Sequence, residues 1–172
     1  MKAFRCVVLV LAVKLLATTA QTASSPVATD ENTGERDIRG WIDRWTKAFS
    51  ARDADAVMEL YADDVIAYDL VPPLQYRGKA EYRTDYQQFF AQYEDNPRVE
   101  VRDLHVAVSG DLGYASGLEL ISGTLKRGRK SELWVRFTSL YRKVNGKWLD
   151  FHDHVSVPAD IETGRAMLDL KP

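Results

Sequence analysis

Hydrophobic residues recur at helical spacing in the first half of the chain. One stripe follows the spacing i, i+3, i+4, i+7, i+10 and i+11, which predicts an amphipathic helix carrying Ile38, Trp41, Ile42, Trp45, Ala48 and Phe49 on its buried face. Asp53 is placed to cap a second, short helix. An aromatic stripe with helical spacing runs from Tyr82 to Tyr93 and ends before Pro97, which predicts a third helix.

Alternation with a period of two replaces this spacing after Pro97. It predicts four long strands, over residues 99–108, 113–126, 131–144 and 147–157. A shorter strand over 65–69 is stopped by Pro72-Pro73. Asn145-Gly146 is the strongest hairpin signal, and strands that follow one another directly pair as an antiparallel meander. The order predicts an α+β fold, with three N-terminal helices packed on a curved antiparallel sheet that forms a cone with an internal pocket.

The first 34 residues have a different pattern. Lys2 and Arg5 precede an apolar run and small residues near Ala20, which predicts a signal peptide over 1–20. Lys14 interrupts that run, so an uncleaved N-terminus is the alternative. Residues 21–34 are rich in Thr, Ser and Ala and are interpreted as a flexible linker, which leaves 35–172 as the folded domain. The protein is therefore expected to be exported, as a periplasmic or secreted protein with no membrane contact after cleavage.

Composition narrows the class of function. The chain has 172 residues, of which 45% are hydrophobic and 28% charged, as expected for one folded domain. A net charge of −2 and the lack of a nucleic-acid motif give no reason to expect a nucleic-acid partner. The single cysteine excludes a disulfide scaffold and a cysteine-based zinc site. There is no phosphate loop, dinucleotide glycine pattern or Gly-x-Ser-x-Gly motif, so no cofactor is predicted.

Several local motifs resemble a known family. The relevant stretches are Ile42 to Phe49, Asp53-Ala54-Asp55, Leu60 to Val65, Arg77-Gly78-Lys79, Gly146-Lys147-Trp148 and His152 to Pro158. They resemble the nuclear transport factor 2-like superfamily, and within it the SnoaL-like and ketosteroid isomerase-like proteins, over about residues 36 to 160. The resemblance implies the same α+β cone, often joined into a homodimer through its sheet. That superfamily includes enzymes, carriers and binding modules, so the fold does not determine the function.

Asp69 is the first candidate for chemistry. The resemblance places it at the position of the isomerase general base, and a carboxylate at the lip of an apolar cone can move a proton between two carbons. Trp45, Tyr61 and Leu70 are expected to surround it and raise its pKa by desolvation. A turn residue before the two prolines explains the same Asp without chemistry. The acidic donors of the isomerase oxyanion hole are replaced by Trp45 and Thr138, so steroid isomerisation itself is not expected.

The last strand supplies the second set of candidates. His152, His154 and Ser156 alternate, so they share a face with Trp148. If Trp148 belongs to the core, the histidines line the cone, and the neighbouring strand brings polar residues beside them. An exposed polar strand face is the alternative. The predicted catalytic residues are Asp69, His152 and His154, and the predicted ligand-binding residues are Trp45, Tyr61, Arg136, Thr138 and Trp148.

A metal site is the weaker interpretation of the same strand. A His-x-His pair would need His105 or Asp150 as a third ligand, and no Asp or Glu stands at a standard ligand spacing, so no metal is predicted. The expected function is binding of a small, mainly apolar molecule in the cone, with cofactor-free general acid–base chemistry of an isomerase or lyase type. The alternative is a non-catalytic ligand-binding or dimerisation module. Chemistry is favoured if Asp69, Arg136 and the two histidines meet in one closed pocket, and the non-catalytic alternative is favoured if they are spread over a solvated sheet face.

Overall fold

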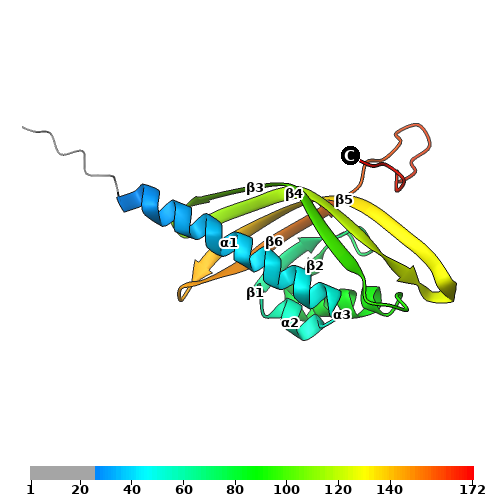
Figure 1. The fold of residues 1–172 in the computed structure, drawn as a ribbon, viewed down its shortest axis with the longest axis horizontal. Coiled ribbons are helices and arrows are strands. Elements are labelled where there is room, and N and C mark those ends of the chain that lie inside the picture. The colour runs from blue at the N-terminus through cyan, green and yellow to red at the C-terminus, as the bar shows by residue number, and fades with distance from the viewer. Residues whose placement is uncertain (1–25) are drawn as a thin grey trace, which may run out of the picture.

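The computed structural model describes residues 26–172 and has the predicted α+β architecture (Figure 1). Its three helices are α1 (Pro26–Ser50), α2 (Ala54–Met58) and α3 (Gly78–Phe90). Its six strands are β1 (Tyr61–Tyr68), β2 (Tyr76–Arg77), β3 (Arg98–Ser109), β4 (Leu112–Leu125), β5 (Arg129–Val144) and β6 (Lys147–Ser156). None of these helices is long and apolar enough to cross a membrane. The predicted signal peptide lies outside the described residues.

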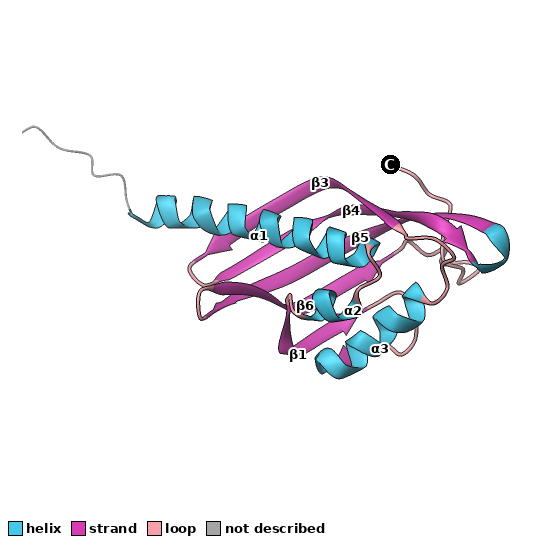
Figure 2. Ribbon diagram, turned by 60° about the horizontal axis from the view of Figure 1, so that its bottom comes forward, coloured by secondary structure: helices cyan, strands magenta, loops and turns pink. Residues whose placement is uncertain are grey.

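The sheet has the order β2-β1-β6-β5-β4-β3 and is not closed into a barrel. Strands β3 to β6 form the predicted antiparallel meander. β1 lies beside β6 and runs parallel to it, so the sheet is mixed rather than wholly antiparallel. A parallel pair needs a long connection, and here β2, α3 and the rest of the meander provide it. Figure 2 shows α1 lying along the sheet, with α2 and α3 near its β1 edge.

The predicted helical stripe forms the centre of the core. Ile38, Trp41, Trp45 and Phe49 are all buried against the sheet and α3. The ring of Trp41 packs edge-on against that of Tyr141 on β5, with 5.0 Å between their centroids. The cap of α2 is also confirmed, because the Asp53 carboxylate accepts a hydrogen bond from the backbone N–H of Ala56 at 3.0 Å.

The first helix begins earlier than the hydrophobic pattern indicates. α1 starts at Pro26, so the interpretation of residues 26–34 as a flexible linker is wrong. Gly34 lies four residues before Ile38 on the same helix face and is buried. A Cβ atom on Gly34 would lie 2.8 Å from the side chain of Val108 and 3.2 Å from that of Trp148. The close approach requires glycine, which leaves this turn of the stripe without an apolar side chain.

A β-bulge interrupts the pairing of β5 with β6. Leu140 pairs with His152, whereas the next residue, Tyr141, pairs with Asp150. Phe151 is therefore an extra residue on β6, with no residue opposite it. Because side chains alternate strictly along a strand, one extra residue reverses the face that all later side chains occupy.

The reversal determines which residues of β6 face the helices. Trp148 and Asp150 are buried before the bulge, as the period of two predicts. After the bulge the buried residue is Asp153, which is 6% exposed, while His154 is exposed. His152 and His154 therefore lie on the outer face of the sheet although they share the even-numbered alternation with Trp148.

Candidate functional site

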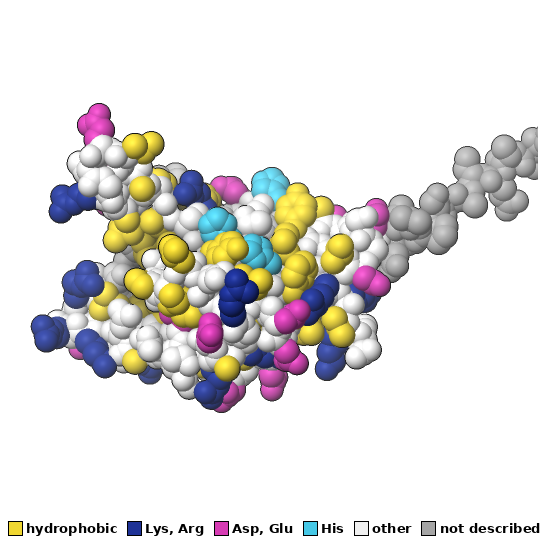
Figure 3. Space-filling view, turned by 180° about the vertical axis from the view of Figure 1, so that it is seen from behind, with side chains coloured by type: hydrophobic (Ala, Val, Ile, Leu, Met, Phe, Trp, Pro, Cys, Tyr) yellow, Lys and Arg dark blue, Asp and Glu magenta, His cyan; other side chains and the backbone are white. Residues whose placement is uncertain are grey.

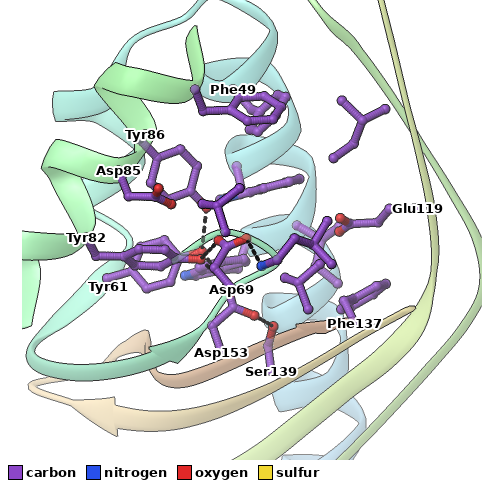
Figure 4. A pocket seen from close by; sticks show the side chains of 18 of the residues that line it. Phe49, Tyr61, Asp69, Tyr82, Asp85, Tyr86, Glu119, Phe137, Ser139 and Asp153 are labelled. Carbon is purple, nitrogen blue, oxygen red and sulfur yellow. Dashed lines mark hydrogen bonds between the residues drawn. The ribbon is translucent and has the colours of Figure 1, made fainter. Parts of the chain in front are cut away.

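A cavity lies between the helices and the inner face of the sheet (Figure 4). The centres of water-sized molecules can occupy about 70 Å³ of it, and it is partly open to solvent. Among the described residues that line it, nine are aromatic, none is Lys, Arg or His, and four carry carboxyl groups: Asp69, Asp85, Glu119 and Asp153. The site is therefore an aromatic cavity with several acids and no basic side chain.

Asp69 follows the last residue of β1 and lines this cavity, as predicted. The backbone N–H of Leu70 donates to its Oδ1 at 2.6 Å, and the Tyr82 hydroxyl donates to its Oδ2 at 3.2 Å. Desolvation, together with the nearby charge of Asp85, raises the pKa of Asp69 to about 7. Its carboxyl group can therefore both accept and release a proton near neutral pH.

Asp153 connects Asp69 to a network of buried hydroxyl groups. Its Oδ2 accepts hydrogen bonds from the hydroxyls of Tyr61 at 3.1 Å and Tyr82 at 2.9 Å. Its Oδ1 accepts from the Ser139 hydroxyl at 3.0 Å. Burial raises the pKa of Asp153, while these hydrogen bonds act in the opposite direction. Since the Tyr82 hydroxyl has one hydrogen and reaches both carboxyl groups, it couples their protonation.

Two further carboxyl groups face the same space. Asp85 on α3 accepts a hydrogen bond from the Tyr76 hydroxyl at 2.9 Å, and burial raises its pKa. Glu119 on β4 is 7% exposed. Burial, followed by the charges of Asp153 and Asp69, raises the pKa of Glu119 to about 8. Figure 4 shows its carboxyl group pointing into the cavity from the sheet, across from Asp85 and Tyr86.

Three of the predicted site residues meet in this cavity: Asp69, Trp45 and Tyr61. Trp45 does not offer a free donor, because its Nε1 already donates to the Tyr86 hydroxyl at 3.0 Å. It contributes an apolar wall instead. Trp148 is buried, but it packs near Gly34 at the far end of α1 and does not line the cavity.

The expected polar cluster lies on the wrong side of the sheet for the cavity. The residues concerned are Arg136, Thr138, His152 and His154. Thr138 and His154 are register partners there, and the Tyr68 ring lies 5.0 Å from that of His152. Figure 3 shows histidine side chains gathered on this outer face. The prediction that these four residues line the cone is wrong, because it assumed unbroken alternation along β6.

Sequence reasoning missed the three acids that do line the cavity: Asp85, Glu119 and Asp153. A signal for two of them exists in the alternation. Glu119 lies two residues before Ile121 on the same face of β4, and Ile121 is buried. Asp153 likewise lies two residues before Val155 on the same face of β6. An acid at an apolar register position indicates a carboxyl group held away from water. Across the described residues, no group of three or more His, Cys, Asp or Glu is arranged to hold a metal ion.

Comparison with known proteins identifies the same fold. The family model for the SnoaL-like domain matches residues 38–160. An NTF2-like protein of unknown function from Pseudomonas putida KT2440 is 33% identical, with a TM-score of 0.74 over 82% of this chain and 98% of that one. No match was found among curated proteins.

Two more distant structures are similar in fold alone. A ketosteroid isomerase-like protein from Erwinia carotovora atroseptica is 23% identical, with a TM-score of 0.64 over 73% of this chain and 96% of that chain. An NTF2-like protein with a cystatin-like fold from Novosphingobium aromaticivorans is 18% identical, with a TM-score of 0.66 over 80% and 90% of the respective chains.

Proposed function

The chain belongs to the SnoaL-like domain family of the NTF2-like superfamily, and on that premise we propose that its cavity binds a small, mainly apolar molecule and transfers a proton on it. Asp69 is the proton acceptor, and the reaction is of an isomerase or lyase type without a cofactor. The observation that carries the proposal is a carboxyl group with a pKa of about 7 at the wall of an aromatic cavity. A general base is most effective when its pKa lies near the working pH.

The neighbours of Asp69 are consistent with this role. Leu70 and Tyr82 donate to separate oxygens of its carboxyl group, which orients it. The aromatic rings of Tyr61, Tyr82 and Tyr86 pack on one another and keep the surroundings dry. A ligand carbon held against this carboxyl would lose a proton to a group that does not have to shed a shell of water first.

The arrangement also restricts the chemistry. Arg136, His152 and His154 lie on the outer face, so they cannot stabilise an enolate in the cavity. Only neutral hydroxyls and protonated carboxyl groups can share charge with the ligand there. The cavity therefore favours reactions in which a protonated carboxyl group donates to the ligand oxygen while Asp69 takes the proton from carbon, so that an enol forms rather than a free enolate.

Non-catalytic binding is the second candidate. It is favoured by the hydroxyl network, in which Tyr61 and Tyr86 contact each other at 3.1 Å and Trp45 donates to Tyr86. Donors that are already occupied in the protein are not free to stabilise a transition state. Two further expectations stay predictions, namely export of the protein and its assembly into a homodimer.

Deuterium exchange distinguishes catalysis from binding even when the natural substrate has not been identified. Wild-type protein is incubated in D2O with a panel of β,γ-unsaturated and β-hydroxy ketones, and NMR follows deuterium incorporation next to the carbonyl. Asp69→Asn should slow exchange about a hundredfold to ten-thousandfold, as expected for loss of a positioned base. Asp63→Asn is the matched control, since Asp63 is an exposed acid of β1 that pairs with Lys79.

Two outcomes would contradict catalysis by Asp69. Exchange at the wild-type rate in Asp69→Asn would show that Asp69 serves only as a turn residue. Ketones that shift the protein's NMR signals without exchanging in the wild type would favour the binding module.

A further inference from the structure

Glu119 differs from the other acids of the cavity in having no hydrogen-bond donor. Asp69 and Asp153 share the Tyr82 hydroxyl as a donor, and Asp85 accepts from Tyr76. No residue in the described part of the chain donates to Glu119. Its carboxyl group is buried, and the charged groups that act on it are other acids. Buried polar groups in folded proteins are nearly always hydrogen-bonded. A carboxyl group that is over nine-tenths buried, unpartnered and aimed into a cavity is therefore placed to receive a hydrogen bond or an opposite charge from a ligand.

The walls around Glu119 determine which kind of ligand group can complete it. The four carboxyl groups face a space into which no lysine, arginine or histidine projects among the described residues. An anionic ligand would add to this like charge, whereas a cation would supply the missing opposite charge. The nine aromatic side chains act in the same direction, because the faces of aromatic rings attract cations.

We propose that the ligand of this cavity is an organic cation, a small aromatic or alicyclic molecule whose protonated or quaternary nitrogen pairs with Glu119. The inference rests on the proposed function in using the same cavity, and it names the substrate class. It agrees with the restriction on chemistry, because removing a proton from a cation does not create a net negative ligand. Ligands bearing a carboxylate or phosphate are excluded.

Cation binding in this cavity is coupled to release of protons. The titratable groups that face Glu119 come from every layer: Asp69 after β1, Asp85, Tyr82 and Tyr86 on α3, Tyr61 on β1, Tyr141 on β5 and Asp153 on β6. Without a cation the pKa of Glu119 is about 8 and that of Asp69 about 7, so both are largely protonated at acidic pH. A permanent cation binds the ionised form, and its affinity therefore rises as the pH rises through this range.

A pair of isosteric probes tests the charge alone. Phenyltrimethylammonium carries a permanent positive charge, and tert-butylbenzene has the same shape without it. NMR titration of the wild-type protein should give at least about tenfold tighter binding of the cation at about pH 8.5 than at about pH 6. The neutral isostere should bind weakly, with an affinity that does not change with pH.

Variants assign the effect to Glu119. Glu119→Gln keeps the shape of the side chain and should weaken cation binding about tenfold at about pH 8.5 while leaving the neutral isostere unaffected. Glu100→Gln is the matched control, because Glu100 is an exposed acid on β3 paired with Arg102. If Glu119→Gln does not fold, the proposal is still tested by whether the wild-type protein binds the cation more tightly than tert-butylbenzene at about pH 8.5.

The proposal is overturned if tert-butylbenzene binds as tightly as the cation at about pH 8.5. It is also overturned if acetophenone binds and loses affinity through about pH 8 in the wild type but not in Glu119→Gln, since Glu119 would then act as a neutral donor to oxygen. These titrations involve no turnover. A failure of deuterium exchange therefore leaves cation binding standing, and a failure of cation binding leaves proton transfer by Asp69 standing.

Discussion

The two faces of the β5–β6 pair carry similar polar pairs in different surroundings. On the inner face Ser139 and Asp153 are register partners, both buried and joined by a 3.0 Å hydrogen bond. On the outer face Thr138 and His154 are register partners, and both are exposed. Water competes with the outer pair, whereas the low dielectric around the inner pair strengthens its hydrogen bond and raises the pKa of the carboxyl group. The face with the shifted carboxyl pKa is therefore the buried one, although the other face carries the histidine, a residue more often associated with catalysis.

Phe151 is what separates these two faces. Without it, the alternation that buries Trp148 and Asp150 would also bury His152 and His154. With it, Asp153 joins the hydroxyl network of the cavity. The difference between the two faces therefore depends on a single inserted residue.

Deleting Phe151 should have the largest effect. The shortened strand would either bury the histidines in place of Asp153 or lose its register with β5. Either result leaves unpaired polar groups in the core, so we expect a loss of more than about 4 kcal/mol in the free energy of unfolding. Urea denaturation followed by circular dichroism measures it, with Phe151→Leu as the control that keeps the strand length. Wild-type stability of the deletion variant would mean that the bulge does not set the two faces.

A lower pH should stabilise the folded protein through the buried carboxyl groups of the inner face. The folded-state pKa values of Asp69 and Glu119, about 7 and about 8, lie above those of the unfolded chain. Between about pH 4 and these values the two groups bind more protons in the folded than in the unfolded protein. Their contribution to stability is therefore greatest below about pH 4 and decreases as the pH rises toward their folded-state pKa values. While they stay protonated in the folded protein, the two groups together contribute somewhat under about 4 kcal/mol between about pH 5.5 and 7.

The exposed carboxyl group of Asp95 has a lowered pKa and therefore acts in the opposite direction, but only at more acidic pH. Urea unfolding over the pH series checks the expected decrease. Asp69→Asn and Glu119→Gln should each make the decrease shallower. A free energy of unfolding that increases between about pH 5.5 and 7 would show that these carboxyl groups ionise normally in the folded protein.

Matched alanine substitutions on the two faces should give the smallest effects and the sharpest contrast. Asp153→Ala removes the shared acceptor of the Tyr61, Tyr82 and Ser139 hydroxyls, and the loss of these buried hydrogen bonds should cost about 2–3 kcal/mol. His154→Ala removes an exposed side chain and should change stability by less than about 0.5 kcal/mol. Thermal unfolding of both variants measures the difference. Equal losses at the two positions would remove the distinction between the faces.

Local patterns were sufficient for most of the elements, and three of the predicted site residues, Trp45, Tyr61 and Asp69, line the cavity. The apolar stripe from Ile38 to Phe49 must be buried in any fold that contains this helix. Asn145-Gly146 favours a hairpin turn independently of what its strands pack against. Asp69 could be placed because the family resemblance implies a general base at the end of the first predicted strand; its spacing alone fits a turn residue equally well. Glycine obscured the start of α1, since Gly34 packs by having no side chain that a hydrophobicity pattern would register.

Only the tertiary structure decided which side chains share the cavity. A bulge appears as a mismatch between two strands, so neither β5 nor β6 reveals it alone, and the reversal at Phe151 was invisible in the alternation of β6. The acids Asp69, Asp85, Glu119 and Asp153 come from different elements and meet because the sheet and the helices enclose one space. Their raised pKa values arise from desolvation by that enclosure, which is a property of the assembled fold and of no single segment.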